Sequence, residues 1–196
     1  MTWVKVCGMT RVEDIEAAEA AGTDAIGLVL ITESPRVVSI DRAADLAATV
    51  TTQAILLTKD MPPEELIAAA LATGVDGVQP YGLHVTEAAK AAGEVGLMVL
   101  LPVSLQTDLG SIPDEQIPLF DNPNSLGGSG QEFDHARLPP TDRRFVLAGG
   151  LAPDNVREMV GSTGAWGVDA VSRLELRPGI KDHDRVSRFI REAKRA

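Results

Sequence analysis

The single cysteine of this 196-residue chain is the residue whose placement most strongly suggests chemistry. Cys7 ends an apolar segment, residues 3–7, that has the composition of a strand, and Gly8 follows it. A lone thiol forms no internal disulfide, so Cys7 is either a small buried hydrophobic residue or a working nucleophile or base. In a parallel α/β protein, catalytic residues usually lie at the carboxyl ends of the strands. Cys7 is therefore the first candidate for a catalytic role.

A second candidate is Asp121, which ends another strand-like segment, residues 117–120. A thiolate and a carboxylic acid that face each other form a general base and a general acid, provided their surroundings reverse the usual order of their pKa values. The alternative for Asp121 is a turn residue, because the sequence Asp-Asn-Pro-Asn favours turns through local hydrogen bonds.

Three segments have the composition of anion sites. Gly128 lies in a Gly-Gly-Ser-Gly stretch, Gly149 and Gly150 follow the strand-like segment 145–148, and Ser172 and Arg173 follow the segment 167–171. Glycine lets backbone N–H groups approach a phosphate closely. No Gly-Lys-Ser/Thr follows the first stretch and it opens no dinucleotide-binding unit, so both nucleotide motifs are rejected. Each glycine pair taken alone is also compatible with a plain tight turn.

One arginine is placed to bind a carboxylate. Arg36 follows the second strand-like segment in Ser-Pro-Arg, and its planar guanidinium matches a carboxylate in bidentate geometry. The alternative is a solvated loop arginine. His84, His135 and His183 are dispersed without metal-ligand spacing, so we assign no metal.

The elements that position these residues alternate along the chain. Eight short apolar runs are predicted as strands: residues 3–7, 25–30, 54–57, 77–79, 96–101, 117–120, 145–148 and 167–171. The clearest helices are predicted between them at residues 12–21, 42–50, 63–73 and 86–92. Thr10 and Glu13 form a capping-box pattern before the first helix, and Asp182 or Asp184 opens the last.

This alternation predicts right-handed βαβ units and a parallel sheet, and eight repeats favour closure into a (β/α)8 TIM barrel over an open sheet. Residues 102–116 are polar and turn-rich, so the fifth helix is expected to be short or missing, and residues 131–137 leave room only for a stub of the sixth. No linker divides the chain, so residues 1–196 are expected to form one domain.

Composition excludes several classes of partner. A net charge of −10 and a pI near 4.7 argue against a nucleic-acid or anionic-membrane surface. An anionic small molecule would need local dipoles and one or two arginines. No run reaches the length of a membrane span, and no signal-like segment precedes the first strand, so we expect a cytoplasmic protein.

Ordered motifs along nearly the whole chain resemble the phosphoribosylanthranilate isomerase family of tryptophan biosynthesis. The matching segments are Lys5-Val6-Cys7-Gly8-Met9-Thr10, Ser34-Pro35-Arg36, Val78-Gln79 with Gly82, Phe120-Asp121, Gly127-Gly128-Ser129-Gly130-Gln131-Glu132-Phe133-Asp134, Leu147-Ala148-Gly149-Gly150-Leu151, Pro153-Asp154-Asn155-Val156 and Pro178-Gly179-Ile180-Lys181-Asp182. Each motif is weak alone, but their order and spacing together are highly specific.

The resemblance implies an Amadori rearrangement of N-(5′-phosphoribosyl)anthranilate to 1-(o-carboxyphenylamino)-1-deoxyribulose 5-phosphate. It implies that Cys7 is the general base at C2′, that Asp121 is the general acid at the ring oxygen, and that Arg36 meets the anthranilate carboxylate. The substrate phosphate is expected at Gly128, Gly149, Gly150, Ser172 and Arg173, with Gln79 and Tyr81 as further substrate contacts. No metal or organic cofactor is expected, and the enzyme is expected to be a monomer or homodimer.

Two segments depart from the family pattern. After the eighth strand the family commonly has Asp-Val-Ser-Ser-Gly-Val-Glu, whereas this chain has Asp169-Ala170-Val171-Ser172-Arg173-Leu174-Glu175, so one serine and the glycine are missing. After the fourth strand, Tyr81 stands in place of the histidine of Gln-Leu-His-Gly. A tyrosine stacks and donates a hydrogen bond but does not titrate near neutral pH.

Three alternatives stay open from the sequence. A related sugar-phosphate isomerase or epimerase shares the fold and the phosphate loops. A histidine-pathway enzyme acts on a similar substrate, but it is expected to use two aspartates, and Cys7 argues against it. The third is a catalytically silent protein that binds a phosphorylated ligand.

Overall fold

Eight parallel strands form a closed barrel in which each strand pairs with its neighbours along the chain and β8 pairs with β1. The computed structural model describes residues 1–121, 138 and 141–196. The barrel strands are β1 (Trp3–Val6), β2 (Ala25–Val29), β3 (Gln53–Lys59), β4 (Gly77–Tyr81), β5 (Met98–Val103), β6 (Gln116–Phe120), β7 (Val146–Leu147) and β8 (Gly167–Ala170). The predicted (β/α)8 barrel is confirmed, and so are all eight strand positions.

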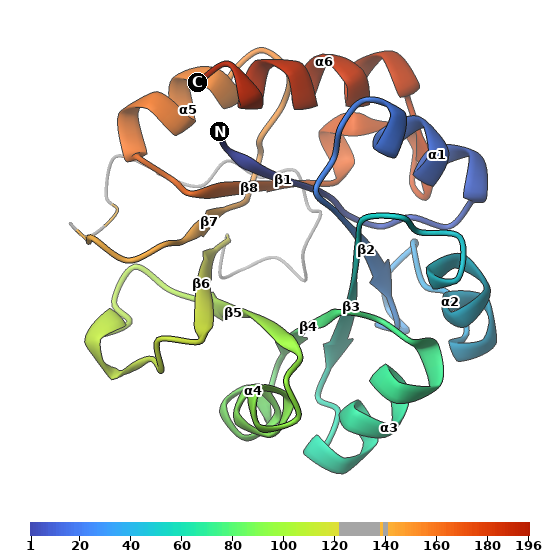
Figure 1. Cartoon of the computed structure of the whole chain (residues 1–196), viewed down its shortest axis with the longest axis vertical. Helices are drawn as coiled ribbons and strands as arrows, with labels where there is room; N and C mark the ends of the chain where they lie inside the picture. Colours follow the sequence, from blue (N-terminus) through green and yellow to red (C-terminus); the bar gives the residue numbers. More distant parts are fainter. Residues whose placement is uncertain (122–137, 139–140) are drawn as a thin grey trace.

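The α-helices lie outside the ring of strands (Figure 1). They are α1 (Val12–Ala20), α2 (Ile40–Ala47), α3 (Pro63–Thr73), α4 (Val85–Glu94), α5 (Val156–Thr163) and α6 (His183–Lys194). After β8 the chain also forms a 3₁₀ helix, η3 (Ser172–Leu174), and an antiparallel hairpin, β9 (Glu175–Arg177) and β10 (Ile180–Lys181). None of the helices in the described residues is long and apolar enough to span a bilayer.

The connection between β5 and β6 contains one 3₁₀ turn, η1 (Leu109–Ser111), in place of an α-helix. The prediction of a short or missing fifth helix is therefore confirmed. Arg143 stabilises this connection, because its guanidinium donates hydrogen bonds to the carbonyl oxygens of Leu109 and Pro113 at 2.9 and 2.8 Å. The stub predicted for the sixth helix, residues 131–137, lies outside the described residues.

The two predicted helix starts have different outcomes. Asp182 caps α6, since its side chain accepts a hydrogen bond from the Arg185 N–H at 3.1 Å. The capping box at Thr10 is wrong: α1 has Arg11 at its N-cap and no side-chain cap bond. The Thr10 hydroxyl instead donates to the Gly179 carbonyl at 2.5 Å. The Thr10 hydroxyl thus bonds to the β9–β10 hairpin instead of to the first turn of α1.

Two apolar layers fill the fold, one inside the barrel and one between the barrel and its helices. Because side chains alternate along a strand, Trp3, Lys5 and Cys7 share one face of the chain, and Cys7 belongs to the inner layer. Tyr81 at the end of β4 packs against the same layer. The sequence periodicity therefore turns Cys7 and Lys5 toward the barrel axis.

Gly27 on β2 provides the space that the Cys7 side chain occupies. A Cβ atom added at Gly27 would lie 2.5 Å from the Cys7 Sγ and 3.1 Å from its Cα. Real Cβ atoms essentially never come within 3.0 Å of a non-bonded heavy atom, so any larger residue at position 27 must displace the thiol or the two strands. Gly27 therefore fixes where the sulfur lies.

Gly27→Ala is expected to destabilise the protein by about 1–3 kcal/mol through overpacking. It should also lower turnover, because the thiol moves. Gly161→Ala is the matched control: Gly161 lies on α5, nothing stands within 4 Å of its added Cβ, and alanine favours a helix by about 0.5–1 kcal/mol. Urea unfolding of both variants measures this difference. Equal stability in the two variants would contradict the proposed packing of Cys7 against Gly27.

Candidate active site

The backbone after β1 holds Cys7 in place. Its N–H donates to the Ala170 carbonyl at 3.0 Å, and the N–H groups of Gly8 and Met9 both donate to the Gly27 carbonyl, at 3.0 and 2.9 Å. Gly8 has a φ of 74°, a conformation that favours glycine. Cys7 is 1% exposed, and its sulfur lies in the inner layer at the carboxyl end of β1. Bonds to both neighbouring strands therefore fix the thiol.

An ion pair lies in the barrel next to Cys7. The Lys5 ammonium is fully buried and donates to the Asp169 Oδ2 at 2.7 Å and to the Gln79 Oε1 at 3.0 Å. Lys5 and Asp169 are register partners on β1 and β8. Burial alone lowers the pKa of Lys5, but the charges of Asp169 and of ionised Cys7 outweigh it and raise that pKa above its ordinary value. Lys5 is therefore a cation in the core.

Burial raises the pKa of the Cys7 thiol above its ordinary value. Lys5 opposes this shift, Asp169 adds to it, and Lys181 opposes it. The Cys7 thiol therefore holds its proton more tightly than an ordinary cysteine does. The physical reason is desolvation, which outweighs the nearby cations.

Tyr81, at the end of β4, lies within the electrostatic influence of both predicted reactive groups. The Gln79 amide nitrogen donates to the Tyr81 Oη at 2.5 Å. Burial raises the pKa of Tyr81 well above its ordinary value, and the charges of Asp121, Asp169 and Cys7 raise it further. Asp121 directly follows β6 and is partly buried. The structure therefore brings Cys7, Gln79, Tyr81 and Asp121 to the same end of the barrel.

Arg36 is buried and paired within the chain. Its Nε donates to the Glu175 Oε1 at 2.8 Å and its Nη2 to the Oε2 at 2.7 Å, a bidentate ion pair in which Arg36 is 6% exposed. A Cβ added at Gly8 would lie 2.6 Å from the Arg36 Cδ, so glycine at position 8 makes room for this side chain. Arg36 is not a solvated loop arginine.

Glu175 and Lys181 connect Arg36 to the loop that carries Cys7. The Lys181 ammonium donates to the Glu175 Oε1 at 3.0 Å and to the Cys7 carbonyl at 2.6 Å. Burial opposes ionisation of Glu175, but the bonds from Arg36 and Lys181 lower its pKa below the ordinary value. Burial lowers the pKa of Lys181, although Glu175 opposes this. The hairpin thus holds the cysteine loop through a buried charge cluster.

The loops predicted for phosphate follow the neighbouring strands β7 and β8. Gly149 and Gly150 have φ values of 82° and 77°, which favour glycine at both positions. Asn155 fixes their loop, since its amide donates to the Gly150 carbonyl at 3.2 Å and its oxygen accepts from the Ala152 N–H at 2.8 Å. Ser172 begins η3, and Arg173 is exposed. Gly128 lies outside the described residues.

Four charged residues of the site were missed from the sequence: Lys5, Asp169, Glu175 and Lys181. The sequence contained a signal for Lys5 and Asp169, because each lies inside an apolar segment predicted as a buried strand. A lysine or aspartate in such a place is rarely buried without a partner of opposite charge. Lys5 also lies two residues before Cys7, on the same face of the strand. Glu175 and Lys181 lie near a turn, where charged residues are usually exposed, so the neighbouring sequence did not indicate that they are buried.

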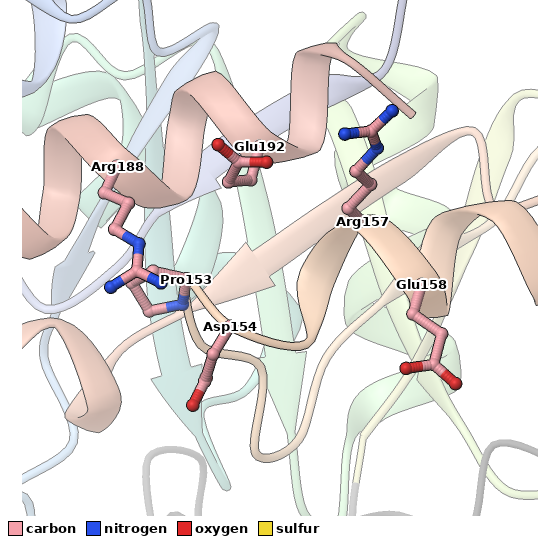
Figure 2. A pocket seen from close by; sticks show the side chains of 6 residues that line it. All are labelled: Pro153, Asp154, Arg157, Glu158, Arg188 and Glu192. Carbon is pink, nitrogen blue, oxygen red and sulfur yellow. The ribbon is translucent and has the colours of Figure 1, made fainter.

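A hollow with a volume of about 620 Å³ lies outside the barrel, among α5, α6 and the loop that precedes α5 (Figure 2). It is lined by Pro153, Asp154, Arg157, Glu158, Arg188 and Glu192. None of the predicted site residues lines it, and its charges are mixed. Within the described residues, no group of three or more His, Cys, Asp or Glu side chains is placed to hold a metal ion.

Comparison with known proteins identifies the family. Residues 4–192 match the model of the family N-(5′-phosphoribosyl)anthranilate (PRA) isomerase. The chain belongs to this family. A curated relative from Geobacter sp. (strain M21), an N-(5′-phosphoribosyl)anthranilate isomerase, is 37% identical over 205 residues, covering 100% of this chain and 99% of the relative.

Solved structures of the family have the same fold. One, in complex with reduced 1-(o-carboxyphenylamino)-1-deoxyribulose 5-phosphate, is 27% identical with a TM-score of 0.83, and the match covers 100% of each chain. A structure of monomers of a dimeric family member from Thermotoga maritima is 27% identical with a TM-score of 0.84, again over 100% of each chain. The family and the fold therefore agree with the sequence motifs.

Glu175→Gln is expected to lower stability by about 3 kcal/mol at neutral pH, because Arg36 and Lys181 lose their buried counter-charge. The pKa of Glu175 is lowered on folding, so its contribution is present above its ordinary pKa of 4.5 and is lost as the pH falls further. Urea unfolding of both proteins should show a difference that shrinks below this pH.

Glu16→Gln is the control for this comparison, because Glu16 is exposed on α1 and should change stability by less than about 0.5 kcal/mol. A Glu175→Gln effect as small as that of the control would show that the charge cluster does not stabilise the fold.

Proposed function

We propose that this chain catalyses the Amadori rearrangement of N-(5′-phosphoribosyl)anthranilate to 1-(o-carboxyphenylamino)-1-deoxyribulose 5-phosphate, an aldose–ketose isomerisation of tryptophan biosynthesis. The main support for this proposal is that Cys7, Tyr81 and Asp121 lie at the same end of the barrel in a member of this family. The family structure that holds the reduced product adds support.

In this mechanism Asp121 is the general acid and Cys7 the general base. Asp121 protonates the furanose ring oxygen, and the C1′–O bond breaks as the anilino nitrogen supplies its electron pair, which gives a protonated Schiff base. The Cys7 thiolate then removes the C2′ proton, and the electrons of the C–H bond move toward the iminium nitrogen. Proton transfer from the C2′ hydroxyl and to C1′ completes the ketone.

The raised pKa of Cys7 fits this sequence of steps. A sulfur with a high proton affinity is a strong base once it is ionised. The thiolate is favoured when a positive charge stands beside it, and the protonated Schiff base supplies such a charge in the open-chain intermediate. Burial therefore makes the Cys7 thiolate a stronger base, and the positive charge of the bound intermediate favours formation of that thiolate.

Binding of the substrate is assigned to the remaining predicted residues. Glu175 accepts from two of the five N–H groups of Arg36, one on Nε and one on Nη2, so the two hydrogens of Nη1 and the second hydrogen of Nη2 are left to bind the anthranilate carboxylate. The phosphate is assigned to the loops of Gly149 and Gly150 and of Ser172 and Arg173. Gly128, which lies outside the described residues, is assigned to the phosphate as well. Gln79 and Tyr81 are assigned to the sugar.

We further propose that residues 1–196 act as one (β/α)8 domain, as a monomer or homodimer in the cytoplasm. The closed barrel from β1 to β8, followed in the chain by α6 on the outside of the ring, supports one domain. The dimeric family member from Thermotoga maritima supports a homodimer as one of the two states.

Cys7→Ala and Asp121→Asn are each expected to lower kcat by a factor of about 10²–10⁴, because each removes one proton-transfer group. The assay is the decay of the fluorescence of phosphoribosylanthranilate. Normal decay in either variant would contradict its catalytic assignment. No decay with the unaltered protein would favour a silent binder of a phosphorylated ligand.

Arg173→Gly is expected to raise KM about fivefold to tenfold and to leave kcat nearly unchanged, because a phosphate contact binds substrate and transition state alike. Arg191→Ala on α6 is the control, since Arg191 is exposed and lies away from the loops after β7 and β8. A fall in KM for Arg173→Gly would show that this side chain obstructs the phosphate site.

A further inference from the structure

The interior charges next to the mouth of the barrel fix the direction of a hydrogen-bond chain. Lys5 donates to the Gln79 Oε1 at 3.0 Å, and the Gln79 Nε2 donates to the Tyr81 Oη at 2.5 Å. Lys5 and Gln79 are 0% and 1% exposed, so bulk water does not compete for these bonds. This series of hydrogen bonds runs from the interior of the barrel to the end where the strands have their carboxyl termini.

The chemistry of the first group determines the orientation of the other two. A lysine ammonium carries only donors, so it must face the oxygen of the Gln79 amide. The NH₂ group of Gln79 then faces Tyr81, and because this group only donates, the Tyr81 oxygen must accept. The single hydroxyl hydrogen of Tyr81 is consequently directed away from Gln79.

Asp169 holds the first residue of this series of hydrogen bonds, Lys5, but does not accept a hydrogen bond from the Tyr81 hydroxyl. Its Oδ2 accepts from Lys5 at 2.7 Å, while its Oδ1 is buried with no hydrogen-bond partner among the described residues. The Tyr81 hydroxyl is therefore not bonded to Asp169. Besides Asp169, the groups whose negative charge raises the pKa of Tyr81 are Asp121 and, when ionised, Cys7, the assigned acid and base.

We propose that Tyr81 is a third catalytic residue, which donates its hydroxyl hydrogen to a sugar oxygen between the points where Asp121 and Cys7 act. Lys5 and Gln79 are the positioning residues that aim this hydrogen. The inference rests on the proposed isomerase function and adds a donor whose direction is set from the barrel core. It also accounts for a tyrosine at this position, because a phenol keeps its hydrogen at neutral pH.

A double-mutant cycle between Tyr81→Phe and Gln79→Met tests the proposal by kinetics. Tyr81→Phe should lower kcat about tenfold or more in the unaltered protein, since it removes one aimed donor. In the Gln79→Met background, where the hydroxyl is no longer aimed, the same change should cost less than about twofold. Tyr81→His, which keeps an N–H donor, should recover part of the lost activity. Equal losses in the two backgrounds would overturn the proposal.

A titration that needs no turnover tests the direction of the bond. The chain has one tyrosine, so replacement by a fluorinated tyrosine, which ionises nearer neutral pH, gives a single absorbance titration. A Gln79 that donates stabilises the phenolate, so Gln79→Met should move the midpoint upward. A downward or absent shift would mean that Tyr81 does not accept from Gln79, and would overturn the proposal.

The two readouts separate this inference from the proposed function. If the unaltered protein does not consume phosphoribosylanthranilate, the isomerase assignment fails, and with it the catalytic role of Tyr81. The titration still decides whether Lys5 and Gln79 direct the hydroxyl. If turnover is normal but the cycle is additive, the isomerase assignment stands and the role of Tyr81 fails. Thermal unfolding of each variant checks that it is folded.

Discussion

The ion pair between Lys5 and Asp169 lies inside a barrel that is otherwise filled mainly by aliphatic side chains, and the groups at the mouth are arranged around it. A buried charge of this kind is costly unless it is paired and hydrogen-bonded. Asp169 supplies the counter-charge and Gln79 supplies a further acceptor, so the ammonium is retained. The same cation favours the thiolate of Cys7 and fixes the amide of Gln79, which in turn bonds Tyr81.

A second charge cluster determines where the thiol is presented. Glu175 holds Arg36 through two hydrogen bonds, and Lys181 joins Glu175 to the carbonyl oxygen of Cys7. Gly8 and Gly27 lack side chains where Arg36 and the Cys7 sulfur need the space. The hairpin after β8, the loop after β1 and the loop after β2 are therefore held together by electrostatics and close packing. Arg36, proposed to bind the carboxylate, and Cys7, the proposed base, are thus linked through one set of buried hydrogen bonds.

Local sequence was sufficient to predict the fold. Apolar runs marked every barrel strand, and Asp182 marked the start of α6, because strand and cap formation depend on neighbouring residues. Residues joined by barrel closure were not predictable in this way: Lys5 and Asp169 are 164 positions apart, and Arg36 and Glu175 are 139 apart. Thr10 failed as a cap for the same reason, since its hydroxyl bonds Gly179, 169 positions away. The family motifs indicated Cys7, Arg36 and Asp121, but not the buried partners that hold them.

Burial increases the proton affinity of Cys7, the proposed base, while the Lys5 cation favours its thiolate. Because Cys7 is the only cysteine, protein labelled with ¹³C at the cysteine Cβ gives one NMR signal whose pH titration reports this thiol directly. The midpoint should lie above the ordinary cysteine pKa of 9.0 and should rise further in Lys5→Met, which removes the nearby cation. A midpoint at or below 9.0, or one that Lys5→Met leaves unchanged, would contradict the account.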